Sequence, residues 1–270
     1  MKKFAYIFVF LMFFASCKTL KLTGEYLENP PAVVPKIALS TDLNRNNWQH
    51  LDPINDSVPG MSVDKAYKEL IKDFEGETVV VAVLDTGIDI KHEDLKGSIW
   101  TNKKEIPGNN IDDDKNGFID DVYGWNFLGE AYYEQLELTR LLAKGEDFPE
   151  KEDAQKDYDK RLAEARGEET LKYYLNYDFK GRTTGDDPDN FEQTQYGDNK
   201  VEHSREDESH GTHVAGIIAA ARNNNLGMKG VANNVEIMTL RVVPYGDEYD
   251  KDVALGIIYA ADNGADIINT

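Results

Sequence analysis

The stretch Ser209-His210-Gly211-Thr212-His213-Val214-Ala215-Gly216 sets a histidine at the start of a predicted helix made largely of small residues. Small side chains let a helix lie close against a sheet or against another helix. A histidine at the end of such a helix is held in one place, and histidine is the side chain that most often serves as a general base near neutral pH. The stretch therefore predicts a helix that presents His210 for chemistry.

A second informative stretch is the apolar run at residues 79–84, which ends in Asp85. An unbroken apolar run of this length is typical of a parallel strand that is buried on both faces. In open α/β sheets, ligands and reacting groups gather at the carboxyl ends of the strands. The run therefore predicts that Asp85 lies at a functional site.

The C-terminal part of the chain predicts more of the same sheet. Residues 235–243 are interpreted as a second buried strand, residues 252–264 have the pattern of a helix that ends at Gly264, and residues 265–270 begin a further strand. A strand, a helix and a strand at this spacing form a right-handed crossover between parallel strands. The predicted class is α/β with a mostly parallel sheet.

The block around Asp85 and the block around His210 resemble, in this order, the first two signatures of the subtilisin-like serine proteases. The resemblance implies a three-layer fold, with helices on both faces of the sheet, and an Asp-His-Ser triad acting on polypeptide substrates. The third signature, a Gly-Thr-Ser turn that opens a helix, does not occur in the sequence. We therefore expect a serine endopeptidase domain that is incomplete at its C-terminus and stops before the nucleophilic serine.

Two other functions remain open at this stage. The chain is compatible with a non-catalytic, calcium-binding surface lipoprotein derived from a protease. It is also compatible with a metal-dependent hydrolase that uses His210 and His213, which lie on successive turns of one helix. The resemblance favours the protease, because it implies that the first histidine is catalytic and that the second packs internally.

Composition limits the possible partners. The 270 residues carry a formal net charge of −20, whereas a surface that binds nucleic acid needs positive charge. A hydrophobic content of 40% is enough for one substantial core. The single cysteine, Cys17, excludes an intramolecular disulfide framework.

The N-terminus indicates export. Lys2 and Lys3 precede an apolar run at residues 4–14, which is shorter than the about 20 residues that span a bilayer and fits a secretory signal. The sequence Phe14-Ala15-Ser16-Cys17 resembles a bacterial lipobox, which implies lipidation of Cys17 and a membrane anchor. The alternative is an ordinary signal peptide with an incidental cysteine. We assign residues 1–17 to a lipoprotein-type signal peptide and residues 18–45, which contain three prolines, to a tether.

The remaining chain divides into two parts. Residues 46–127 and 204–270 are assigned to the partial peptidase domain, which includes a helix from about Ser62 with Ala66, Leu70 and Ile71 on its apolar face. Residues 128–203 are assigned to an acidic, largely helical insertion. Its tyrosines, Tyr173, Tyr174 and Tyr177, are interpreted as packing residues, with substrate contact as the alternative.

An acidic loop at residues 110–121 predicts a calcium site. Oxygen-bearing side chains recur at alternate positions from Asp112, and Gly117 permits the sharp turn of an EF-hand-like loop. Tyr123 stands where the bidentate glutamate belongs, and Asp121 is the carboxylate that can replace it. The alternative is an acidic surface turn without metal. The predicted ligands are Asp112, Asp114, Asn116, Asp120 and Asp121.

A second calcium site follows from the resemblance alone. The asparagine-rich stretch at residues 222–227 resembles a calcium loop of the family. By position, Asn224 supplies a side-chain oxygen and Asp94 supplies a carboxylate.

Overall fold

The computed structural model of the protein describes residues 46–72, 76–182, 184–203, 205 and 208–270. The predicted signal peptide and tether, with Cys17, lie outside these described residues. Within the described residues, no helix has the length and apolar character that crossing a bilayer requires. Four parallel strands form one sheet in the order β2-β3-β1-β4, and their bounds are β1 Val79–Asp85, β2 Gly124–Asn126, β3 Val235–Arg241 and β4 Ile267–Asn269.

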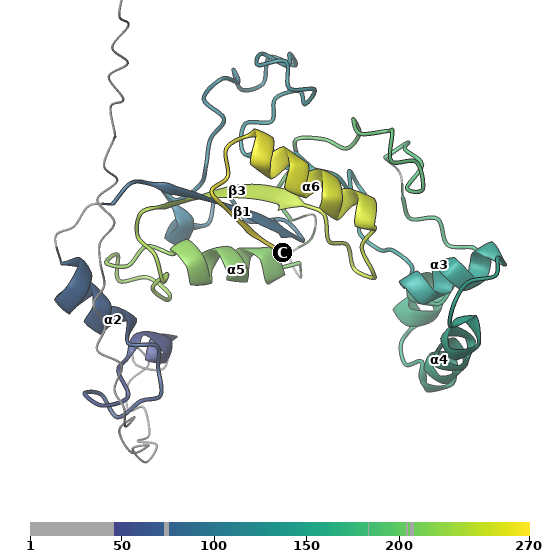
Figure 1. The fold of residues 1–270 in the computed structure, drawn as a ribbon, viewed down its shortest axis with the longest axis horizontal. Coiled ribbons are helices and arrows are strands. Elements are labelled where there is room, and N and C mark those ends of the chain that lie inside the picture. Colours follow the sequence, from purple (N-terminus) through teal and green to yellow (C-terminus); the bar gives the residue numbers. More distant parts are fainter. Residues whose placement is uncertain (1–45, 73–75, 183, 204, 206–207) are drawn as a thin grey trace, which may run out of the picture.

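Helices cover both faces of this sheet. Helix α5 (His210–Ala219) lies against one face and helix α6 (Asp250–Asp262) lies against the other (Figure 1). Alternate side chains of β1 enter the two layers, so that Val83 packs with the α5 side and Leu84 with the α6 side. The unbroken apolar run of β1 is therefore explained by burial on both faces, and the predicted three-layer α/β fold is confirmed.

The strand register shows which edge of the sheet carries Asp85. Asp85, the last residue of β1, is level with Arg241, the last residue of β3. Because the two strands are parallel, their carboxyl ends meet at the same edge of the sheet. The core is aromatic on the α6 side, where Phe118 packs edge to face against Trp125 and Tyr259.

The lead-in helix differs from its predicted form. Helix α2 (Val63–Ala66) is followed by a π-helical turn, η2 (Tyr67–Ile71), and two 3-10 turns, η1 (Trp48–His50) and η3 (Glu93–Leu95), lie nearby in the chain. The predicted burial of Leu70 is wrong, because its side chain is 60% exposed. A π-helical turn breaks the 3.6-residue spacing on which the predicted apolar face depended.

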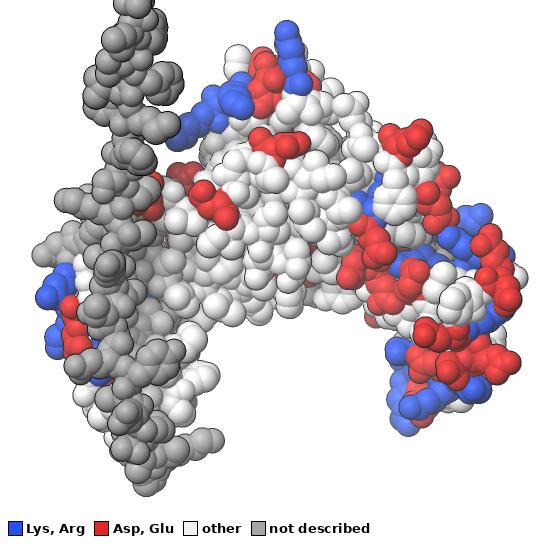
Figure 2. All heavy atoms as spheres, viewed as in Figure 1, with Lys and Arg blue, Asp and Glu red and all other residues white. Residues whose placement is uncertain are grey.

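The region of residues 128–203 contains helices, as expected. They are α3 (Glu137–Lys144), α4 (Lys151–Glu164) and the π-helical turn η4 (Thr170–Tyr174). Leu142, Tyr158 and Leu175 form a small buried cluster of their own. Figure 1 shows α3 and α4 to one side of the sheet, and Figure 2 shows acidic and basic side chains crowded over that part. The exact bounds of an insertion remain a prediction.

Candidate active site

Asp85 and His210 come together at the edge of the sheet. The Nδ1 atom of His210, the first residue of α5, lies 2.9 Å from Oδ1 and 2.8 Å from Oδ2 of Asp85. The aspartate side chain is 10% exposed, whereas the histidine side chain is 75% exposed. The buried carboxylate therefore holds one ring nitrogen, and Nε2 lies on the far side of the ring, toward solvent.

Backbone groups fix the orientation of Asp85. The amide of Thr86 donates to Oδ1 of Asp85 at 2.7 Å. The carbonyl oxygen of Asp85 accepts hydrogen bonds from the amides of Val242 and Val243 at 3.0 and 3.2 Å. The carboxylate is thus held before any substrate arrives, which is the preorganisation that catalytic groups need.

The glycine at position 211 allows the start of α5 to lie close to the end of β1. A Cβ atom on Gly211 would lie 2.3 Å from the carbonyl oxygen of Gly87 and 3.2 Å from the Cβ atom of Asp85. The amide of Gly211 also reaches the hydroxyl of Thr86 at 3.3 Å. The small residue after His210 is therefore required by the contact between α5 and the end of β1.

An open groove of about 400 Å³ lies in front of the histidine. A histidine oriented by a buried carboxylate can accept a proton from a hydroxyl nucleophile and return it to a leaving group. The site therefore has the geometry of the base and the orienting acid of a triad. The residues that line this groove are Thr86, Glu208, Ser209, His210, His213, Pro244, Tyr245 and Gly246.

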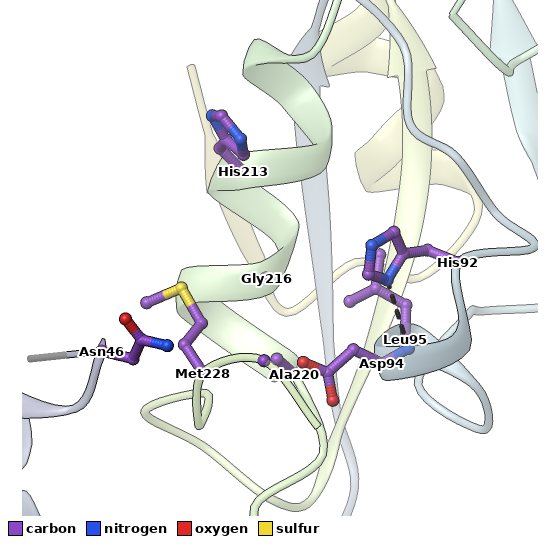
Figure 3. A pocket seen from close by; sticks show the side chains of 9 residues that line it. Asn46, His92, Asp94, Leu95, His213, Gly216, Ala220 and Met228 are labelled. Atoms are coloured by element: carbon purple, nitrogen blue, oxygen red, sulfur yellow. Dashed lines mark hydrogen bonds between the residues drawn. The ribbon is translucent and has the colours of Figure 1, made fainter. Parts of the chain in front are cut away.

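His213 does not join a metal-binding group. Among the described residues, the only cluster of three or more potential metal ligands lies elsewhere, in the acidic loop. Figure 3 shows a second, mostly apolar cavity of about 390 Å³ beside α5, with His213 near the start of the helix and Asp94 near Ala220. His213 lines this cavity as well as the groove.

Asp94 and Asn224 lie side by side, but Oδ1 of Asn224, the predicted ligand atom, accepts the amide of Leu226 at 3.0 Å. The Nδ2 atom of Asn224 donates to Oδ1 of Asp94 at 2.6 Å, and the Asp94 side chain is buried. The backbone carbonyl of Asp94 accepts from the amide of Ala221. The structure therefore joins the two loops, and a role for this pair as metal ligands remains a prediction.

Three carboxylates lie together at the acidic loop. Two of them belong to the loop, and the third, that of Glu105, precedes it and was not predicted from the sequence. Ligand atoms of Glu105, Asp114 and Asp121 all lie within 4.8 Å of one another. Burial, together with the neighbouring carboxylates, raises the pKa of Glu105 and of Asp121. Three clustered carboxylates suit a hard cation with oxygen ligands, so the residues present fit calcium.

Other predicted ligands in this loop have different contacts. The carboxylate of Asp112 accepts the amides of Asn116 and Gly117 at 3.1 and 2.9 Å. The carboxylate of Asp120 accepts three amides at residues 108–110. Asn116 donates through Nδ2 to Asp121 at 2.8 Å. The carboxylates of Asp112 and Asp120 therefore shape the loop, and so does that of Glu105, which accepts the amides of Asp113, Asp114 and Asp120. What sets Glu105 apart is its position close to Asp114 and Asp121. The sequence reasoning missed Glu105.

Comparison with known proteins shows the family of the chain. The model of the subtilase family of peptidases matches residues 76–270, and the chain belongs to this family. Subtilisin-like protease 1 of Plasmodium falciparum is 26% identical over 177 residues, which are 65% of this chain and 16% of that protein. A thermophilic serine proteinase from Bacillus sp. (strain AK1) is 50% identical over 62 residues, 23% of this chain and 16% of that protein.

A further relative is the cell wall-associated protease of Bacillus subtilis, which is 46% identical over 65 residues, 24% of this chain and 7% of that protein. In these three relatives the matched part spans between 7% and 16% of the whole protein. Subtilases commonly bind calcium, and the acidic cluster of this chain is a place where such an ion fits.

Proposed function

We propose that this chain is the N-terminal half of the catalytic domain of an exported serine endopeptidase. His210 is the general base, Asp85 is its orienting acid, and the nucleophilic serine is supplied by residues that follow position 270. The observation that carries this proposal is the contact between Nδ1 of His210 and the buried carboxylate of Asp85, at the edge of an open groove.

The geometry suits the two halves of acyl transfer. Nε2 of His210 takes the proton from the serine hydroxyl and later gives it to the leaving amine. Asp85 holds the ring in one tautomer through Nδ1 and stabilises the imidazolium that forms. A structural calcium ion, held by Glu105, Asp114 and Asp121, would neutralise the carboxylates of the acidic loop.

Export and anchoring are part of the same proposal. The apolar run at residues 4–14 favours secretion, and the sequence ending in Cys17 favours a lipid anchor on a bacterial membrane. One relative is named as cell wall-associated. Mass spectrometry of the mature N-terminus tests this point, because a diacylated Cys17 supports the anchor and cleavage at another residue without lipid contradicts it.

The first experiment on the catalytic claim is to read the source DNA past codon 270 and to express the complete gene product. We expect an open frame that encodes a Gly-Thr-Ser turn, and covalent labelling of the product by a serine-directed fluorophosphonate. His210→Ala abolishes the labelling, whereas His213→Ala, on the same helix, retains it if it folds. A genuine stop after Thr270, or labelling that persists in His210→Ala, contradicts the proposal.

The second candidate is a non-catalytic calcium-binding surface protein, which the acidic cluster at Glu105, Asp114 and Asp121 favours. It predicts a complete gene product that folds normally and binds calcium, yet neither reacts with the fluorophosphonate nor cleaves casein. Calcium is kept constant in these assays, because its removal is expected to destabilise the protein whichever of the two functions it has.

A further inference from the structure

Two buried charged residues lie beneath the candidate active site. Arg241, at the end of β3, is 1% exposed, and Glu208, two residues before His210, is fully buried. Nη2 of Arg241 lies 3.1 Å from Oε1 of Glu208, so the two form an ion pair away from solvent. The catalytic roles proposed above use neither residue.

The guanidinium of Arg241 holds three segments of chain at once. Its Nε atom donates to the carbonyl oxygen of Thr86, the neighbour of Asp85, at 2.9 Å. Its Nη2 atom donates to the carbonyl oxygen of Ala131 at 3.0 Å as well as to Glu208. Its Nη1 atom reaches the carbonyl oxygen of Gly129 at 3.2 Å and the Asn126 side chain at 3.3 Å.

These contacts join the two segments of backbone that carry Asp85 and His210, the pair called the dyad below. Thr86 follows Asp85 directly, and Glu208 precedes His210 by a single intervening residue. The planar guanidinium has donors in a fixed fork, so it sets the relative position of its acceptors in a way that a flexible ammonium does not. The remaining acceptors lie where β2 leads into the region of residues 128–203.

Stability alone is a poor explanation for this pair. Burying an arginine and a glutamate carries a large desolvation cost, and well-packed apolar side chains in their place are often at least as stable. A buried ion pair at this position is better explained by the geometry that it enforces on its neighbours.

We propose that Arg241 and Glu208 are positioning residues that set the separation of Asp85 from His210. This inference rests on the proposed function in so far as the dyad is catalytic. The side chains of the pair bind neither the carboxylate of Asp85 nor the ring of His210. The pair acts through Thr86 on one side and through the start of α5 on the other.

The test compares Arg241→Lys with the wild type in the complete gene product. NMR measures the exchange of the His210 Nδ1 proton with water, and steady-state kinetics on a peptide substrate give kcat and KM. We expect the proton to exchange about tenfold faster and kcat to fall by about tenfold, with KM changed by less than about twofold, because the defect lies in orientation rather than in substrate binding.

A double variant, Glu208→Gln with Arg241→Met, guards against misfolding, because it leaves no uncompensated buried charge. The same two changes are expected in it. The control is Arg182→Lys, since Arg182 forms a buried bidentate ion pair with Asp252 away from the dyad. This control is expected to lower the melting temperature without changing proton exchange or kcat.

Unchanged proton exchange in both Arg241 variants overturns the positioning role, and so do equal changes in Arg182→Lys. Failure of the proposed function is seen separately. If the wild-type product does not hydrolyse peptides, the Nδ1 exchange still shows whether Arg241 and Glu208 hold His210 against Asp85.

Discussion

Gly211 is the residue on which the contact between the sheet and α5 depends. Its missing side chain lets the start of the helix approach within van der Waals distance of Gly87 and Asp85. Any Cβ atom at this position would displace the helix start, and with it His210, from the carboxylate. The close contact is confined to the start of α5. A Cβ atom on Gly216, about one and a half turns later, would meet nothing within 4 Å beyond its own helix.

Gly211→Ala is therefore expected to lower kcat/KM of the complete protease by about 10²-fold, the cost of displacing a catalytic group by about 1 Å. Gly216→Ala is the matched control on the same helix. It is expected to leave kcat/KM unchanged and to stabilise the protein by about 0.5–1 kcal/mol, since alanine is the better helix former. Equal activity of the two variants would show that the helix start is not held as the structure indicates.

Among single residues, the sequence revealed the polar side chains that stand at the ends of regular patterns. Asp85 ends an apolar run and His210 opens a run of small residues, so both were found from spacing and context. Arg241 and Glu208 were not found, because their pairing is a tertiary contact with no periodic signal. The one signal for Arg241 was its position as a charged residue inside the apolar run at residues 235–243.

Among the elements, the acidic loop is tied to α6. The Tyr259 hydroxyl, on that helix, donates to Asp121, and the side chain of Asn102 donates to Asp114 and Asp121. The loop thus has a buried attachment to the core on the α6 side of the sheet. A cation held by this loop would stabilise its packing against the helix as well as the loop itself.

The structure and the EF-hand-like spacing make different predictions about calcium. Calcium at 100 times its dissociation constant is expected to raise the free energy of unfolding by about 2.7 kcal/mol. Glu105→Gln is expected to remove most of this gain, because it neutralises one of the three clustered carboxylates. Asp112→Asn is expected to retain it, since Asp112 does not belong to the cluster of three carboxylates. Thermal unfolding with calcium and with a chelator measures both.

The opposite result, with the calcium response lost in Asp112→Asn and kept in Glu105→Gln, would contradict the cluster as the calcium site. It would support the EF-hand-like ligand set instead. Sequence spacing could not separate the two, because it reports only ligands within one short segment. Glu105 lies before that segment and reaches it through the fold of the loop, where its carboxylate accepts the amides of Asp113 and Asp114.

At the scale of the whole molecule, a buried carboxyl group lies where the region of residues 128–203 meets the peptidase body. Glu134 is 2% exposed, and its amide donates to the carbonyl oxygen of Tyr245, which lines the groove. Burial raises the pKa of Glu134 to about 7, against the opposing charges of Arg140 and Arg182. The carboxyl group is therefore protonated in the folded protein over a range where it is ionised in the unfolded chain.

This difference predicts a stability that depends on pH. The contribution of Glu134 is complete below its unfolded pKa of 4.5 and is lost as the pH rises through about 7. Over this window Glu134 is expected to contribute a fall of about 3 kcal/mol to the free energy of unfolding, and Glu134→Gln is expected to remove that part of the fall. The raised pKa values of Glu105 and Asp121 contribute in the same direction in both proteins. Urea unfolding at pH 4.5 and pH 7.5 measures it.

Glu130→Gln is the control for this measurement, because the side chain of Glu130 is 82% exposed and its replacement should leave the pH dependence intact. A fall of the same size in Glu134→Gln and in the wild type would show that another group is responsible.

The sheet and its two covering helices were predictable from the sequence because apolar runs and small-residue spacing report burial directly. Val79–Asp85 and Val235–Arg241 are buried along most of their length, and their patterns left little choice. The place of α3 and α4 was not predictable. Their charged surfaces and small separate core at Leu142, Tyr158 and Leu175 carry no signal for where they dock.

The most direct test of the central claim is the value of kcat/KM for Asp85→Asn in the complete gene product at neutral pH. Asparagine preserves the shape of the side chain but no longer stabilises the productive tautomer and the imidazolium of His210. We expect kcat to fall by about 10⁴-fold with a nearly unchanged KM. Activity within about tenfold of the wild type, in a variant that folds and binds calcium normally, would contradict the assignment of Asp85 and His210 as the catalytic pair.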